Sequence, residues 1–230
     1  MKKLFVLIAA ACMTCTAAFA QTVKPFKEGE RAVFLGNSIT DGGHYHSYIW
    51  LYYMTRFPDM PIRVFNGGIG GDTAYDMNKR LDGDIFAMKP SVLMVTFGMN
   101  DSGYFEYNGD KPKEFGEQKY QESIKNYQQM EKRFKDLPDT RIVMVGTSPY
   151  DETVQLKENT PFKTKNETIK RLVEYQKESA AKNNWEFTDL NAPMTAINQQ
   201  YQQKDPTFTL CGSDRIHPDN DGHMVMRSEE

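Results

Sequence analysis

The chain has 230 residues, of which 39% are hydrophobic and 26% are charged, and its formal net charge is −3. A mildly acidic chain of this composition is typical of a globular protein, and its charge argues against nucleic acid or an anionic membrane as a partner. No repeat, low-complexity tract or long linker divides the sequence, so we expect one domain.

Residues 1–20 have the features of a secretory signal peptide. Two lysines precede an apolar stretch over residues 4–11, and residues 18–20 (Ala-Phe-Ala) have the small-x-small pattern of a cleavage site. The apolar stretch is too short to remain as a membrane anchor. We therefore expect a mature protein of residues 21–230 that is secreted or periplasmic and has no integral membrane segment.

The three cysteines bear on both processing and stability. Cleavage after Ala20 removes Cys12 and Cys15, so only Cys211 remains and no intramolecular disulfide can form. A lipoprotein acylated at Cys12 is less favoured, because the preceding residues lack the usual leucine. The net charge of the mature chain is about −5.

Along the mature chain, apolar runs of strand length alternate with stretches of helical periodicity. The strand-like runs lie at residues 32–35, 62–65, 92–97, 142–146 and 185–188, and the helix-like stretches at residues 45–57, 73–81, 118–135, 168–182 and 192–203. This alternation predicts an α/β fold in which a parallel sheet is covered by helices on both faces. Right-handed crossovers then bring the strand ends to one common edge.

Polar clusters follow three of these strands, where open α/β sheets bind their ligands. Ser38 comes just after the first strand, a glycine-rich turn at residues 67–71 follows the second, and Asn100 and Asp101 follow the third. We expect these residues to lie close together.

An Asp-x-x-His pattern near the far end supplies the remaining groups for serine catalysis. Serine needs a base to take its proton, and the base needs a third group to hold it in one tautomer. His217 is the candidate base and Asp214 its orienting carboxylate, with Pro218 favouring the turn that brings them together. Taken alone, this pattern also fits an ordinary helix entry.

Attack on an ester creates an oxyanion, which needs hydrogen-bond donors fixed in advance. Three candidates are the backbone N–H groups of Ser38 and Gly71 and the side-chain amide of Asn100. Glycine at position 71 lets the main chain approach a ligand closely.

The four segments together resemble conserved blocks of the SGNH or GDSL hydrolase family. Residues 36–39 (Gly-Asn-Ser-Ile) stand in place of Gly-Asp-Ser-Leu, and Gly71, Asn100 and the pair Asp214 and His217 match the other blocks. The resemblance implies a three-layer α/β/α sandwich of flavodoxin-like type and an esterase that uses no cofactor.

One departure concerns the end of the chain. In the resembled family a long final helix follows the Asp-x-x-His block, whereas here the sequence stops shortly after residues 222–226. We expect a C-terminal helix that is missing or altered, or a fragment of a longer protein, and apolar surface exposed on one face of the sheet.

The substrate is the least specified part of the prediction. Tyr104 and Tyr107, on the loop after Asn100, are candidates to stack on sugar rings, and Asp101 is a further candidate substrate contact. The resemblance and the lack of a long apolar lid favour removal of acetyl groups from a polysaccharide. A short-chain esterase, a lysophospholipase and a thioesterase remain open, and the sequence specifies no oligomeric state.

Three other interpretations are less favoured. A zinc site would use His44 and His46 with Asp41 and Asp101, but four histidines in the whole chain leave little material for metal chemistry, and we expect no bound metal. The glycines at 67–71 do not fit a nucleotide-binding motif. A non-catalytic glycan-binding module would have no need of a complete set of catalytic side chains.

Overall fold

The computed structural model describes residues 21–228, so the expected signal peptide lies outside the described residues. Six strands form one sheet in the order β1-β6-β5-β4-β2-β3, and every neighbouring pair is parallel. The strands are β1 (Gln21–Thr22), β2 (Arg31–Gly36), β3 (Arg63–Gly68), β4 (Val92–Val95), β5 (Arg141–Gly146) and β6 (Glu186–Asp189).

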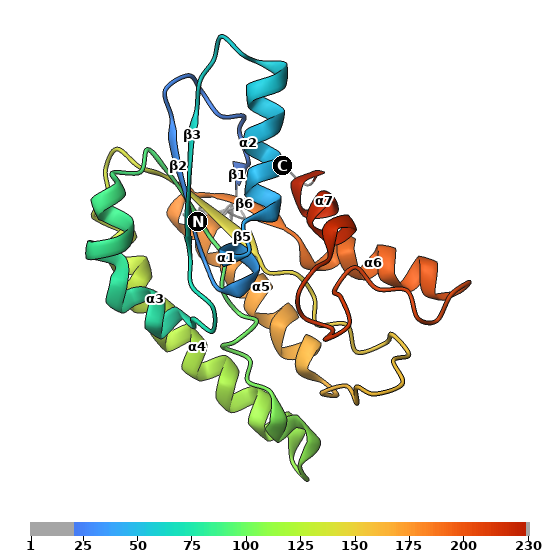
Figure 1. Cartoon of the computed structure of the whole chain (residues 1–230). Coiled ribbons are helices and arrows are strands. Elements are labelled where there is room, and N and C mark those ends of the chain that lie inside the picture. Colours follow the sequence, from blue (N-terminus) through green and yellow to red (C-terminus); the bar gives the residue numbers. More distant parts are fainter. Residues whose placement is uncertain (1–20, 229–230) are drawn as a thin grey trace, which may run out of the picture.

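Helices cover both faces of this sheet. They are α1 (Ser38–Asp41), α2 (His44–Arg56), α3 (Ala74–Arg80), α4 (Pro112–Lys135), α5 (Lys165–Asn183), α6 (Asn191–Gln202) and α7 (Asn220–Ser228), with the short turns η1 (Leu81–Ile85), η2 (Phe86–Met88) and η3 (Phe105–Asn108). Figure 1 shows α3 and α4 on one side of the strands and α2, α6 and α7 on the other. The predicted three-layer α/β/α arrangement is confirmed.

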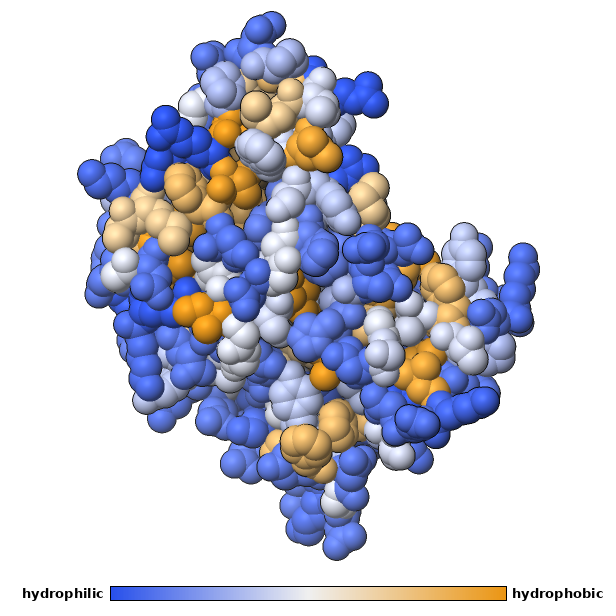
Figure 2. Space-filling view, in the orientation of Figure 1, coloured by the Kyte–Doolittle hydropathy of each residue, from blue (hydrophilic) through white to orange (hydrophobic). Residues whose placement is uncertain are grey.

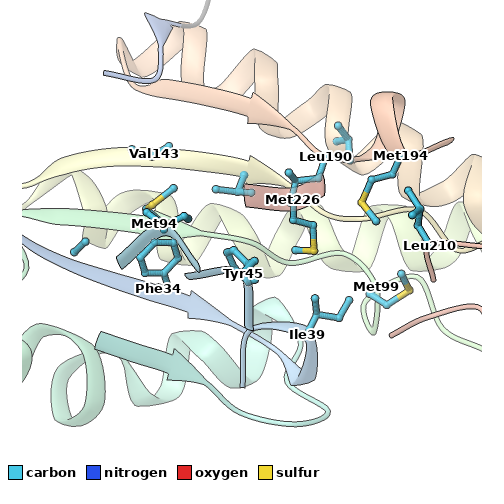
Figure 3. Packing of buried hydrophobic residues seen from close by; sticks show 14 of the residues in the cluster. Phe34, Ile39, Tyr45, Met94, Met99, Val143, Leu190, Met194, Leu210 and Met226 are labelled. Atoms are coloured by element: carbon cyan, nitrogen blue, oxygen red, sulfur yellow. The ribbon is translucent and has the colours of Figure 1, made fainter. Parts of the chain in front are cut away.

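Alternating side chains of the central strands fill two separate cores. Phe34 and Met94 point into the core beneath α2, α6 and α7, whereas Leu35 and Val95 point into the core beneath α3 and α4. Figure 3 shows the first core, where Met226 of α7 meets side chains from the sheet and from α6. Strands that are buried on both faces read as continuous apolar runs, which is why the sequence predicted them so clearly.

The shorter helices and strands were not predicted from the sequence. It gave no sign of the two-residue β1, and the four-residue α1 is too short to show helical periodicity. It also placed the start of α4 at residue 118, whereas the helix begins at Pro112. Proline at the first helical position is favourable because the N–H that it lacks would have no partner there.

The expected exposure of a sheet face is wrong for the described residues. The central strands are buried, and α7 packs against α2 and buries Met226. Hydrophilic residues cover most of the face shown in Figure 2, and hydrophobic residues form small separate patches. The exposed large apolar side chains include Trp50, Leu51 and Met54 of α2.

None of the helices within residues 21–228 combines the length and the hydrophobicity needed to cross a bilayer.

Candidate active site

Ser38 lies at the carboxyl edge of the sheet, on the first residue of α1. Strand β2 ends at Gly36, and the side-chain Oδ1 of Asn37 accepts a hydrogen bond from the backbone N–H of Ile39 at 3.1 Å. Asn37 therefore serves as the N-cap, as an aspartate would in the resembled motif. This cap fixes the turn that carries Ser38 out of the strand.

His217 and Asp214 meet Ser38 from the loop before α7. His217 Nδ1 lies 2.6 Å from Asp214 Oδ2, and His217 Nε2 lies 2.8 Å from Ser38 Oγ. The Asp214 carboxylate only accepts hydrogen bonds, so Nδ1 carries the proton and Nε2 is left to accept one from the serine hydroxyl. The predicted nucleophile, base and carboxylate are thus joined in one hydrogen-bonded chain, although 179 positions separate Ser38 from His217.

Asp214 is itself held in place by the backbone of its own loop. Its Oδ1 accepts the N–H groups of Ile216 and His217, each at 2.9 Å. Burial alone would raise the pKa of Asp214, but the hydrogen bonds from the side chain and backbone of His217 and from Ile216 outweigh it and hold the pKa at about 2. The carboxylate is therefore ionised at neutral pH.

The electrostatics of His217 follow from the same contact. The hydrogen bond to Asp214 raises the pKa of His217 above its usual 6.5, and burial opposes this effect. An imidazole with a raised pKa is a stronger base. It must be neutral before it can accept a proton, so the pair is suited to general base chemistry at neutral to alkaline pH.

Arg215, which no sequence pattern singled out, anchors the loop between Asp214 and His217. Its guanidinium is buried and donates to the carbonyl groups of Asp151, Val154 and Asn159 at 3.1, 2.7 and 2.6 Å. Its backbone has a φ of 69°, which is uncommon for a residue with a side chain. Five N–H donors in a rigid fork make arginine suited to this role.

The glycine-rich turn after β3 lies directly beside Ser38. A Cβ built on Gly70 would lie 4.0 Å from the Cβ of Ser38, and Gly71 has a φ of 86°, a conformation that favours glycine. The side-chain Nδ2 of Asn100 donates to the carbonyl of Asp72 at 2.9 Å, which ties the strand end after β4 to the same turn. The turn that contains Gly71 thus lies beside Ser38 and is joined by a hydrogen bond to Asn100.

Both carboxylate oxygens of Asp101, a predicted substrate contact, accept hydrogen bonds from within the protein. It is buried, its two carboxylate oxygens accept the N–H groups of Ala74 and Gly98 at 2.9 Å each, and Ser123 also donates to it. The carboxylate joins β4, α3 and α4 beneath the site. Burial raises the pKa of Asp101, while these hydrogen bonds lower it.

Tyr107 is buried as well, so its ring is not exposed for the predicted stacking on a sugar. Its hydroxyl donates to the carbonyl of Ser102 at 2.8 Å and lies 3.0 Å from Thr168 Oγ1, whose own hydroxyl can donate to it. Tyr104 is half-buried, and its hydroxyl donates to the side-chain oxygen of Asn100. A single sequence does not distinguish these two tyrosines, because their different burial depends on tertiary packing.

The histidines of α2 do not form the alternative zinc site. His46 is buried and contacts the carbonyl of Thr40 at 3.1 Å, whereas the ring of His44 stacks on His223 at a centroid distance of 4.9 Å. Within residues 21–228, no group of three His, Cys, Asp or Glu side chains is placed to hold a metal ion. Burial lowers the pKa of His223 to about 4, with His44 contributing, so His223 is neutral.

A pocket of about 380 Å³ opens at the catalytic serine. Its walls are mostly polar or small; the residues that line it are Ser38, Ile39, Gly42, His44, His217, Pro218, Asp219, Asn220 and His223. A cavity of this size with several polar side chains in its wall has room for a small acyl group on a polar carrier.

The close approach of α1 to β3 depends on Gly68. A Cβ at this position would lie 2.2 Å from the backbone nitrogen of Asp41, so α1 would have to move. We expect Gly68→Ala to lower the free energy of unfolding by about 1–3 kcal/mol and to reduce esterase activity, because Ser38 lies on α1. Urea unfolding and kinetics with p-nitrophenyl acetate measure both effects.

Gly83→Ala is the matched control, because nothing lies within 4 Å of a Cβ at that position. We expect it to leave activity unchanged and to shift stability by no more than about 0.5 kcal/mol. Equal behaviour of the two variants would contradict the role given to Gly68.

Comparison with known proteins agrees with this geometry. The model of the GDSL-like lipase/acylhydrolase family matches residues 34–225. An acetylxylan esterase from Geobacillus stearothermophilus is 26% identical over 214 residues, which cover 86% of this chain and 90% of that protein.

Two solved structures are also similar. One, described as BT4096, a gut microbial diltiazem-metabolizing enzyme, is 84% identical with a TM-score of 0.90, and the match covers 91% of this chain and 47% of that one. The chain therefore spans about half the length of that protein. The other is Axe2, an acetylxylan esterase from Geobacillus stearothermophilus, with 25% identity, a TM-score of 0.68, and 88% and 93% of the two chains covered.

Proposed function

The chain belongs to the GDSL-like lipase/acylhydrolase family, a family of carboxylic ester hydrolases, and on this premise we propose that it is a serine esterase that removes acetyl groups from carbohydrates. The observation that carries the proposal is the hydrogen-bonded chain from Ser38 through His217 to Asp214. An esterase needs these three groups in this order, and a binding module does not.

In the first half of the reaction, Ser38 Oγ attacks the acyl carbon of the ester. His217 Nε2 takes the proton of the hydroxyl, and Asp214 stabilises the imidazolium that forms. The bond to the leaving alcohol then breaks, and His217 donates its proton to that alcohol. The products of this half are an acetyl-serine and a free hydroxyl on the carrier.

The second half regenerates the enzyme. Water attacks the acetyl-serine while His217 accepts one of its protons, and collapse of the tetrahedral intermediate returns that proton to Ser38 and releases acetate. In both halves the negative charge on the acyl oxygen is stabilised by the backbone N–H groups of Ser38 and Gly71 and by the amide of Asn100. Donors held by the fold need no reorganisation as this charge develops.

The carbohydrate part of the proposal is supported by two observations. The pocket at Ser38 is lined mainly by polar and small residues, and the acetylxylan esterase relative matches nearly the whole chain. A polar acetylated sugar fits such a pocket better than a long acyl chain does. Cleavage of residues 1–20 would deliver the enzyme outside the cytoplasm, where such polysaccharides are met.

A second candidate substrate is an acetyl ester on a small molecule. The structure with 84% identity is described as a diltiazem-metabolizing enzyme. By its chemical formula, diltiazem is an acetate ester. The same serine chemistry would remove that acetyl group. The two candidates differ only in the alcohol that leaves, so one enzyme can accept both.

Acyl length provides the test of this function. We expect kcat/KM for p-nitrophenyl acetate to exceed that for the octanoate, because each added methylene yields about 0.8 kcal/mol of binding only where an apolar wall receives it. Acetate release from acetylated xylo-oligosaccharides and from diltiazem, measured beside the chromogenic esters, ranks the carriers. A preference for octanoate would indicate a lipase, and hydrolysis of neither acetylated carrier would contradict the proposed substrates.

A further inference from the structure

The side-chain amide of Asn100 has two orientations of nearly the same shape, in which the oxygen and the NH₂ group exchange places. For catalysis it has to be held in one of them. Only the orientation that presents its NH₂ group to the substrate can stabilise an oxyanion. In the structure, Nδ2 donates one hydrogen to the carbonyl of Asp72 at 2.9 Å, and Oδ1 accepts the hydroxyl of Tyr104. The carbonyl of Asp72 can only accept, so a flipped amide would place two oxygens against each other. The second hydrogen of Nδ2 is then available to a substrate.

Tyr104 is held between two neighbours. Its ring lies 4.0 Å from Lys165 Nζ, and the ring of Phe162 packs against it edge-on at a centroid distance of 6.0 Å. Burial raises the pKa of Tyr104, as do the nearby carboxylates of Asp101 and Asp214. The hydroxyl therefore stays protonated and can donate to Asn100 at any working pH.

Lys165 is buried at the start of α5, and its ammonium group donates hydrogen bonds to the loop that carries Asn100. Its ammonium group has three hydrogens. Nζ lies 2.7 Å from the carbonyl of Met99, 2.6 Å from Ser102 Oγ and 2.5 Å from the carbonyl of Gly103. These contacts bracket Asn100 on both sides along the chain.

An apolar side chain would fill this position at a lower energetic cost, because burying an ammonium group is unfavourable. Burial lowers the pKa of Lys165 to about 7, although Asp101 and Glu152 oppose the shift. The three acceptors around Nζ match the three hydrogens of an ammonium group, so they favour the protonated form and oppose this shift. These contacts fix a loop that must present the Asn100 amide at one position.

We propose that Tyr104 and Lys165 are positioning residues of the oxyanion site, Tyr104 holding the carboxamide of Asn100 and Lys165 holding the loop that carries both. This inference rests on the proposed function, because it concerns the same reaction. It replaces the sugar-stacking role that the sequence suggested for Tyr104. Both residues act through Asn100 and contact no reacting atom.

The test is Tyr104→Phe, which removes only the hydroxyl. With p-nitrophenyl acetate we expect kcat to fall about 10-fold to 100-fold while KM changes less than about twofold, because the lost contact serves the transition state. In an Asn100→Ala background, itself slower by about 10²-fold to 10³-fold, the added Tyr104→Phe change should have almost no further effect. A residue that only stabilised the fold would reduce kcat equally in both backgrounds.

Tyr107→Phe is the matched control, because it loses a hydroxyl on the same loop that contacts Ser102 and Thr168 rather than Asn100. We expect its kcat to change less than about threefold. Lys165→Met should reproduce the non-additivity with Asn100→Ala if it folds, and the tyrosine variants decide the question if it does not.

Three outcomes would overturn the inference: equal losses of kcat in the two tyrosine variants, a full Tyr104→Phe effect in the Asn100→Ala background, or a change confined to KM. These results are distinct from failure of the proposed function. That failure would appear as activity retained by Ser38→Ala, whatever the tyrosine variants do.

Discussion

Replacing Ser38 with alanine is expected to lower the turnover of p-nitrophenyl acetate by about 10⁴-fold or more while leaving the fold intact. The hydroxyl oxygen of Ser38 lies 2.8 Å from the base nitrogen of His217, so it is the atom that gains nucleophilic character. Ser38 is half-buried at the edge of the site, so loss of one oxygen leaves the two cores unchanged. Steady-state kinetics and circular dichroism measure the two parts of the expectation.

Ser47→Ala provides the matched control. Ser47 is an exposed serine on α2, and its hydroxyl bonds only to the carbonyl of Gly43 one turn earlier in the chain. We expect this variant to keep full activity. Activity retained by Ser38→Ala would mean that another group supplies the nucleophile, and activity that EDTA abolishes and zinc restores would revive the metal interpretation of His44 and His46.

The sheet and the position of the site could be predicted because they depend on local patterns. Buried parallel strands appear as apolar runs, and the carboxyl ends of such strands meet at one edge. Ser38, the turn at Gly71 and Asn100 each follow a strand directly. Their convergence follows from topology alone, and the Asp-x-x-His spacing brings His217 and Asp214 together on one loop.

The environment of individual side chains near the site could not be predicted in this way. Asp101 and Tyr107 have residue types typical of binding sites, and their burial is decided by α3, α4 and α5, which pack around them. Lys165 lies 62 to 66 positions from the backbone that it holds. No local pattern in the sequence links a lysine to carbonyl groups that far away.

Arg215 is a similar case. It stands inside the Asp-x-x-His segment, and no sequence pattern assigns it a role. The structure buries it against carbonyl groups of residues 151–159. A buried arginine with most donors satisfied stabilises a loop whose exact shape matters for catalysis.

The hydrogen bond between Asp214 and His217 leads to the second large effect, which depends on pH. Asp214 raises the pKa of His217, and His217 must be neutral to accept the proton of Ser38. In the wild type, kcat/KM should therefore increase with pH through an apparent pKa above 6.5 and then level off. A stronger base stays protonated up to a higher pH, so the enzyme loses activity in acid.

Asp214→Asn removes the negative charge and the fixed acceptor for Nδ1. Burial then dominates the pKa of His217, so we expect the acidic limb of the kcat/KM profile to move to lower pH. The plateau should fall by about 10²-fold to 10⁴-fold, because the imidazole is no longer held in the productive tautomer and the imidazolium is no longer stabilised. Both changes are read from one pH profile with p-nitrophenyl acetate.

Asp221→Asn is the control for charge alone, since it removes an exposed carboxylate four positions after His217 in the first turn of α7. We expect its profile to match that of the wild type, because charges exposed to water are screened. If Asp214→Asn kept the acidic limb of the wild type, another group would be setting the pKa of the base. If it also kept the plateau, His217 would not be the base that activates Ser38.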